Sequence, residues 1–250
     1  HSCSAPGLEM TFLLEPYAAR SCPVKTFNAF DPGTPKPEKP LDESLLEAFS
    51  GGSEFRESML EALCRADDVV DLHDEGHNPA KTLAAMETGA PVIVGGCLPV
   101  DVTGHRTGCP DALVRGDDRP GGRPGYWPLR VKPYRLLEKQ HNAKELRASA
   151  IGSPTTLEPL PGFRFRSYRQ GVLLELAHHW RLLQACGRAA TTPVAGVIGF
   201  DDHRKGMIVW VPLELRFLRT FSRTSANGYR LRSALERYDH EHGFRVHVAQ

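Results

Sequence analysis

Two short apolar segments on either side of a polar turn constrain the fold of this 250-residue chain more than any other feature. Residues 107–115 and 126–132 are rich in apolar and β-branched side chains, whereas residues 116–125 consist mainly of Gly, Pro, Arg and Asp. Strand formers that flank a cluster of turn formers predict a β-hairpin with a long polar tip. Because side chains alternate along a strand, the hairpin also predicts which polar residues share a face.

Asp111 on the first of these strands and Lys132 at the end of the second are expected to converge on one face. An acid two residues before such a lysine would complete a site in which two carboxylates bind Mg²⁺ or Mn²⁺ and the lysine orients the attacking water. In this chain that residue is Arg130. A guanidinium is always charged and cannot ligate a cation, so a conventional metal site is disfavoured.

The rest of the chain predicts an α/β fold with a central mixed β-sheet flanked by helices. Apolar residues recur at helical spacing in several segments, and Asn78 followed by Pro79 predicts a capped helix start. We expect helices near residues 14–20, 54–66, 79–87, 135–148, 169–185 and 230–238, and further strands at 91–94, 195–200 and 207–212. We also expect an irregular, proline-rich arm and linker at 1–40 and a single domain at 41–250.

Charge and hydropathy limit the classes of partner. The 31 basic and 30 acidic side chains nearly cancel, so binding of nucleic acid would require a local basic surface. No apolar run reaches the roughly 18 residues that cross a bilayer, which predicts no membrane partner. No charged and apolar leader with a cleavage site opens the sequence, so we expect a cytoplasmic protein.

Cysteines and histidines give no clear metal motif. The six cysteines contain no CxxC pair, so we expect most of them to be buried small hydrophobes or free thiols rather than zinc or iron–sulfur ligands. His73 and His77 are four residues apart, but a glycine and an Asn-Pro pair predict a loop there. The order of residues from His73 to His77 also differs from the His-Glu-x-x-His motif of zinc proteases, and this difference disfavours a metal role for the two histidines.

Four other segments carry a wider likeness: Tyr17-Ala-Ala-Arg20, Thr82-Leu-Ala-Ala-Met86, Gly89-Ala-Pro-Val-Ile93 and Arg232-Ser-Ala-Leu-Glu-Arg-Tyr-Asp239. With Gly108-Cys-Pro-Asp111 and Lys132, they make most of the chain resemble the actinobacterial RecB-like nuclease family of the PD-(D/E)XK superfamily. The resemblance implies a PD-(D/E)XK core, nucleic acid as a partner, and hydrolysis of phosphodiester bonds with Mg²⁺ or Mn²⁺.

The first and third motifs of that family are altered here. The family's first acid follows a phenylalanine on an early helix, but Arg56 follows Phe55 in this chain. Glu54 is a weak substitute as a metal ligand, because each residue along a helix turns a side chain by about 100° and Glu54 lies two residues before position 56. Arg130 stands in place of the acid of the third motif. The resemblance therefore implies a degenerate active site.

A later helix of RecB-type enzymes carries a glutamine followed four residues on by a tyrosine. Glu175 and His179 stand at the matching positions, and His179 is a candidate general acid or base. In a working nuclease, Asp111 and Lys132 would be the surviving catalytic residues, and Glu54 or Glu175 would have to complete the metal shell.

Three functions remain open at this point. The first is a RecB-like nuclease homologue whose hydrolysis is weakened or lost. The second is a repurposed enzyme that acts on a small anionic molecule, which Arg56, Arg130 and Lys132 would bind while His179 or Glu175 moves protons. The third is a non-catalytic binding or scaffold protein. A cleft filled by arginines that are neutralised by carboxylates would favour this third function.

Overall fold

The computed structural model describes residues 12–35, 43–201 and 206–250, with only the backbone for 43–50. The helices are α1 (Pro23–Phe30), α2 (Glu43–Cys64), α3 (Pro79–Glu87), α4 (Gln170–Ala185) and α5 (Ala234–Ala249). Short 3₁₀ turns are η1 (Ala18–Arg20), η2 (His73–Glu75) and η3 (Ser167–Arg169). None of the helices in these ranges is long and apolar enough to cross a membrane.

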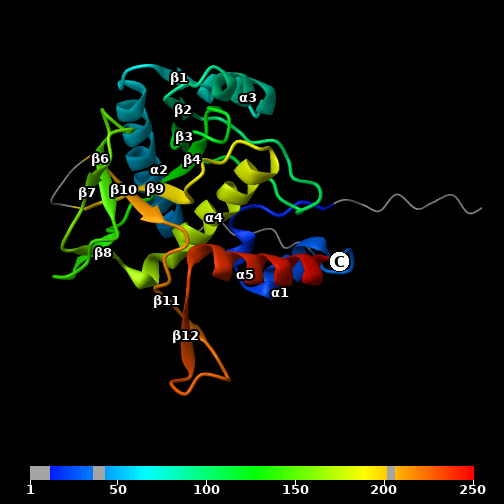
Figure 1. Ribbon diagram of the computed structural model, residues 1–250. Coiled ribbons are helices and arrows are strands. Elements are labelled where there is room, and N and C mark those ends of the chain that lie inside the picture. Colours follow the sequence, from blue (N-terminus) through cyan, green and yellow to red (C-terminus); the bar gives the residue numbers. More distant parts are fainter. Residues whose placement is uncertain (1–11, 36–42, 202–205) are drawn as a thin grey trace, which may run out of the picture.

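The strands form one large mixed sheet and two small antiparallel pairs (Figure 1). The large sheet has the order β1 (Val69–Asp71), β2 (Val92–Val94), β3 (Ala112–Arg115), β4 (Tyr126–Val131), β9 (Val194–Ile198), β10 (Met207–Pro212), β6 (Arg147–Ala150) and β7 (Glu158–Pro159). The pairs are β5 (Leu137–Lys139) with β8 (Phe163–Phe165), and β11 (Leu218–Phe221) with β12 (Tyr229–Arg232). The predicted α/β class with helices flanking a mixed sheet is confirmed.

Alternate residues of the central strands are buried on opposite faces of the sheet. Val92 and Val94 belong to the same hydrophobic cluster as Leu63 of α2, whereas Ile93 belongs to a second cluster with Met86 of α3. The period of two in a strand accounts for this division. Helices therefore cover both faces of the sheet.

The hairpin predicted at 107–132 is present as β3 and β4. These strands pair antiparallel, with Ala112 opposite Leu129. β4 then runs parallel to β9, and α4 lies in the connection between them. Parallel neighbours need such a crossover because a tight turn cannot join them. This arrangement brings α4 against the end of the hairpin that carries Lys132.

Several predicted elements are confirmed, and one cap is visible in detail. Asn78 accepts hydrogen bonds from the amides of Ala80 and Lys81 at the start of α3, at 3.1 and 3.4 Å. Gly89, two residues after the end of that helix, has a φ of +76°. The helix predicted at 169–185 corresponds to α4, and the strands predicted at 195–200 and 207–212 correspond to β9 and β10.

The helix predicted at 135–148 is wrong, because this segment holds β5, a loop and the start of β6. The Asp201 carboxylate accepts hydrogen bonds from the amides of Leu136 and Leu137 at 3.1–3.2 Å, which holds them outside a helix. Arg147 and the next three residues pair with β10. Tertiary pairing therefore overrides the local helical pattern.

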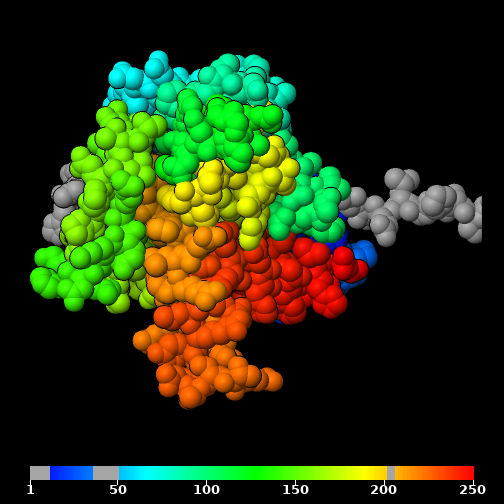
Figure 2. Space-filling view, in the orientation of Figure 1, coloured from blue at the N-terminus to red at the C-terminus, as the bar shows by residue number. Residues whose placement is uncertain are grey.

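Both ends of the chain also differ from prediction. The helix expected at 14–20 is only the turn η1, and the segment expected to be irregular contains α1, which packs against α5. Residues 36–40 of the expected linker lie outside the described ranges. The last helix was predicted at 230–238 but begins after Ser233, whose side chain accepts from the Glu236 amide in a capping box. The four residues before Ser233 form β12, which projects with β11 from the body (Figure 2).

Candidate functional site

Asp111 lies just before β3, where the hairpin positions its carboxylate. Its amide donates to the Leu129 carbonyl at 3.1 Å, which extends the pairing of β3 and β4 by one residue. Its Oδ2 accepts from the Val131 amide at 2.7 Å, and the residue is 1% exposed. One carboxylate oxygen is therefore used to hold the two strands in register.

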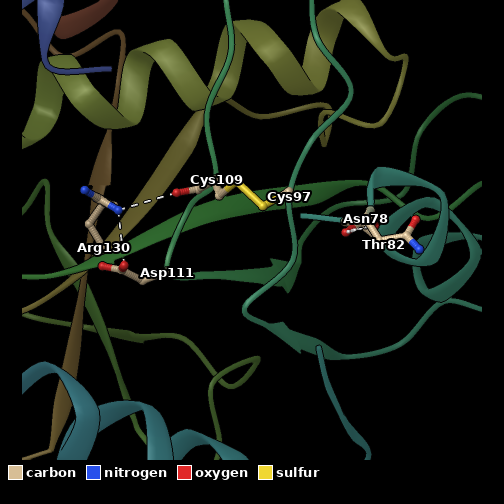
Figure 3. The surroundings of a disulfide bond; sticks show 6 residues. All are labelled: Asn78, Thr82, Cys97, Cys109, Asp111 and Arg130. Atoms are coloured by element: carbon tan, nitrogen blue, oxygen red, sulfur yellow. Dashed lines mark hydrogen bonds and ion pairs between the residues drawn. A yellow bond between two sulfur atoms is a disulfide. The ribbon is translucent and has the colours of Figure 1, made fainter. Parts of the chain in front are cut away.

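Arg130 of β4 bridges the two buried carboxylates of the site. Its Nη1 donates to Asp111 Oδ1 at 3.1 Å, while its Nε and Nη2 donate to Glu175 Oε2 at 3.2 and 3.1 Å. Figure 3 shows the guanidinium close to Asp111 and to the Cys109 carbonyl, 3.5 Å from Nη1. The residue found where the metal-binding acid was expected thus fixes the hairpin to α4.

Glu175 of α4 is surrounded by cations. Besides Arg130, it accepts from Lys132 Nζ at 3.1 Å on Oε1 and 2.8 Å on Oε2, and from Arg20 Nη1 on Oε1. The residue is 3% exposed. Both of its oxygens therefore have charged donors.

Arg56 of α2 is the fourth cation of the network. Its Nε donates to Asp111 Oδ1 at 2.8 Å. The neighbouring Phe55 ring packs 4.9 Å from the ring of Phe200, which anchors this turn of the helix. Glu54 is exposed and forms no ion pair with the described residues of the site. The structure thus brings Arg56, and not Glu54, to Asp111.

Four cations and two carboxylates give this network a formal excess of two positive charges. Burial alone would raise the pKa of Glu175, but Lys132 and Arg130 outweigh it, and the pKa is lowered. Burial also lowers the pKa of Lys132, and the nearby Glu175 only partly offsets this. Glu175 is therefore held as a carboxylate by its neighbours.

These residues do not fit a divalent metal. Asp111 Oδ2 is bound by a backbone amide, and the other three carboxylate oxygens are bound by guanidinium or ammonium groups. An ion such as Mg²⁺ would have to displace Arg130 and then lie beside its positive charge. The geometry is that of a closed ion-pair network.

Elsewhere in the described ranges, only two other sets of side chains are close enough to hold a metal. One set is Cys64, Asp71 and His73, whose ligand atoms lie within 4.8 Å of one another but already hydrogen-bond among themselves. The other set contains His77 with Cys97 and Cys109, whose sulfurs are bonded to each other and so are not thiolates.

Cys97 and Cys109 form a disulfide, so these two depart from the expectation that most of the cysteines are buried hydrophobes or free thiols (Figure 3). The expectation is confirmed for Cys22, Cys64 and Cys186, which are free. The spacing of 12 residues did not resemble a motif, because the pairing depends on how the loop between β2 and β3 folds back. The bond lies two residues from Asp111 and braces the strand that carries it.

His179 lies one helical turn after Glu175, as its position in α4 requires. The residue is fully buried, and neither ring nitrogen has a hydrogen-bond partner among the described residues. Burial, and then the positive charge of Arg130, lowers its pKa well below 6.5. A neutral ring with no polar partner has no evident path for a proton, so its expected acid–base role stays a prediction.

His178, the neighbour of His179, belongs to a second buried network. Its Nε2 donates to the Thr107 carbonyl at 2.9 Å, so its Nδ1 accepts from the Tyr238 hydroxyl, also at 2.9 Å. Tyr238 in turn accepts from Arg106 Nε at 3.1 Å. These bonds fix the loop before Asp111 against α4 and α5. His178 Nδ1 can accept from the Tyr238 hydroxyl only while the ring is neutral.

We expect stability to fall as the pH drops below 6.5. Burial lowers the pKa of His178 from 6.5 to about 3. Between pH 6.5 and pH 3 the histidine is therefore protonated in the unfolded chain but neutral in the folded protein. Lowering the pH from about 7.5 to about 5.5 should therefore cost about 1.4 kcal/mol through His178 alone. Urea unfolding at both pH values measures this. His178→Gln should reduce the difference, whereas His141→Gln, an exposed control, should not. An equal pH dependence in all three proteins would contradict this assignment.

The structure brings together Arg56, Asp111, Arg130, Lys132 and Glu175, all of which the sequence had marked as candidates. It also adds Arg20, which had been noted only as part of a family-like segment. A residue 155 positions from Glu175 gives no local signal of such a contact.

Comparisons of the chain with protein-family models, curated proteins and solved structures find no match.

Proposed function

We propose that the protein is a RecB-like nuclease homologue of the PD-(D/E)XK type that has lost metal-dependent hydrolysis and acts as a non-catalytic binding protein. The observation that carries this proposal is the position of Arg130, whose guanidinium lies between Asp111 and Glu175 and donates to both. At that position the guanidinium pairs with both carboxylates, as a metal ion would, but it cannot activate a water molecule for hydrolysis.

The framework supports a nuclease origin. Asp111 and Lys132 lie at the ends of two adjacent antiparallel strands, and Glu175 faces them from the helix that crosses over to β9. This is the convergence that the motifs of the nuclease family imply. The polar residues of the site come from segments far apart in the sequence, so a chance cluster is a poor explanation.

The pairing pattern supports the loss of catalysis. In a metal-dependent nuclease the carboxylates must be free to bind the cation, and the metal must lower the pKa of its water. Here each carboxylate oxygen has a donor already, and removing such donors from a buried site carries a large desolvation cost. Nuclease activity would require the network to open.

A second candidate function is binding of a small anion at the same network. Arg20 and Arg56 have side chains that are 36% and 44% exposed, and the network carries excess positive charge. Guanidinium groups match carboxylate and phosphate anions. Arg56, Arg130 and Lys132 would then hold the anion, as the sequence suggested. The buried, neutral His179 gives less support to proton transfer in that site.

A cleavage assay tests the proposal. Labelled single- and double-stranded DNA and RNA would be incubated with Mg²⁺ or Mn²⁺ and either the natural protein, Asp111→Asn or Lys132→Ala. We expect no cleavage above the level of the two variants, which serve as controls for contaminating nuclease. Cleavage by the natural protein that both variants lose, while they remain folded by circular dichroism, would overturn the proposal.

A further inference from the structure

A cavity of about 340 Å³ lies between η1, the start of α4, and α5. In Figure 1 the N-terminal segment, α4 and α5 meet in this part of the molecule, and these elements contact one another. Four arginines contribute to the lining: Arg20, Arg169, Arg237 and Arg245. Arg20 also pairs with Glu175, which does not line the cavity, so the cavity adjoins the ion-pair network through Arg20 alone.

The lining has a strong excess of positive charge. Glu241 is the one carboxylate among its described residues, and Arg20 is paired with Glu175 of the neighbouring network, which leaves a formal excess of two positive charges. Glu241 is itself engaged by Arg245 Nη1 at 2.8 Å. Cations gathered around one cavity repel each other unless an anion joins them.

Donors in this cavity are left without partners. The Arg245 side chain is only 5% exposed, yet its Nε has no hydrogen-bond partner among the described residues. The Nε atoms of Arg169 and Arg237 are also buried and unpartnered in the described part of the chain. Because these Nε atoms are buried, an anion in the cavity would meet the terminal nitrogens of Arg169 and Arg237, of which only Arg237 Nη1 has an acceptor, Gln170 Oε1, among the described residues.

Arg169 is held by aromatic rings rather than by an acid. Its guanidinium carbon lies 4.1 Å from the centre of the Tyr134 ring and 5.2 Å from that of Tyr168. Within the described residues its guanidinium forms no hydrogen bond or ion pair. Stacking fixes the plane of the guanidinium but leaves its terminal N–H groups available.

We propose that this cavity binds a phosphate monoester, namely the terminal phosphate of a nucleotide. A dianionic phosphate balances the charges of Arg169 and Arg237, and its oxygens can accept from the terminal nitrogens of both, whereas a carboxylate has only two oxygens. Tyr168 is 61% exposed beside the cavity and offers a ring on which a base can stack. The volume is sufficient for a small ligand.

The source of the phosphate can be a free mononucleotide or the 5′ end of a polynucleotide, and the chemistry is the same. Calorimetric titrations without divalent metal would compare inorganic phosphate, AMP, adenosine, and one oligonucleotide with either a 5′-phosphate or a 5′-hydroxyl. Because no metal is present, these titrations do not depend on whether the Asp111 network can cleave nucleic acid.

Arg169→Gln is the most informative variant, because Arg169 has no polar partner whose loss would disturb the fold. We expect AMP to bind at least tenfold more tightly than adenosine, and Arg169→Gln and Arg237→Gln each to weaken AMP binding about tenfold. Arg164→Gln removes an exposed arginine that pairs with Glu138, and it should leave the affinity unchanged. Thermal melting of each variant would establish that it is folded.

Two outcomes support the proposal and identify the source. A 5′-phosphorylated oligonucleotide that binds more tightly than AMP indicates a polynucleotide end, and equal affinity indicates a free nucleotide. The proposal is overturned if AMP and inorganic phosphate fail to bind at millimolar concentration. It is also overturned if the phosphate group makes no difference, or if both variants bind AMP as the natural protein does.

Discussion

Replacing Glu175 with alanine is expected to lower the free energy of unfolding by about 3–5 kcal/mol, because it removes one member of a buried ion-pair network and leaves its partners uncompensated. Glu175 is the acid that neutralises Lys132 and Arg20, and it shares Arg130 with Asp111. For a domain of this size the melting temperature should fall by roughly 6–20 °C. Denaturant unfolding of both proteins at neutral pH measures the loss.

Two further variants separate the charge of Glu175 from its size and from surface effects. Glu175→Gln keeps an acceptor oxygen and the side-chain volume, so it should cost less than the alanine variant. Glu138→Ala removes an acid whose partner, Arg164, is more than half exposed, and it should cost less than about 1 kcal/mol. If Glu175→Ala were no more harmful than Glu138→Ala, the network would not hold α4 to the hairpin.

The hairpin and the main helices could be predicted because their signals are local. The turn formers between β3 and β4 and the cap at Asn78 act over a few residues, and α4 shows its apolar pattern along one continuous segment. The ion pairs of Arg56 with Asp111, and of Arg130 with Asp111 and Glu175, join residues that the sequence had marked as candidates. Once the hairpin and α4 are placed, alternation in the strand and the helical turn determine which side chains converge.

The features that were missed depend on contacts between distant segments. Residues 135–148 have a helical pattern, but β10 pairs with Arg147, and Asp201 binds the backbone at Leu136. Arg20 reaches Glu175 from a segment expected to be an irregular arm. No local pattern encodes such contacts.

The disulfide bears on the expected cytoplasmic location. Disulfides persist in oxidising compartments and are rare in the cytosol, where thiols are kept reduced. The bond between Cys97 and Cys109 therefore weighs against that expectation. Because the bond braces the loop that leads to Asp111, its redox state also bears on the order of the site.

Arg130→Glu is expected to create a divalent metal site that the natural protein lacks. The substitution removes the guanidinium that donates to Asp111 and Glu175. It also supplies a carboxylate two residues before Lys132, where the nuclease motif has its acid. Three carboxylates around one point would repel each other without a cation, so Mn²⁺ should bind and raise the melting temperature of this variant. Arg130→Gln removes the guanidinium without adding an acid and is the matched control.

The most direct measurement is a Mn²⁺ titration of the natural protein, Arg130→Glu and Arg130→Gln, followed by electron paramagnetic resonance. If Arg130 takes the place of the metal, the natural protein shows no site that depends on Asp111, Arg130→Glu gains one, and Arg130→Gln binds more weakly than Arg130→Glu. Binding of Mn²⁺ by the natural protein that Asp111→Asn abolishes would contradict the account. A folded Arg130→Glu variant that gains no Mn²⁺ site would contradict it as well.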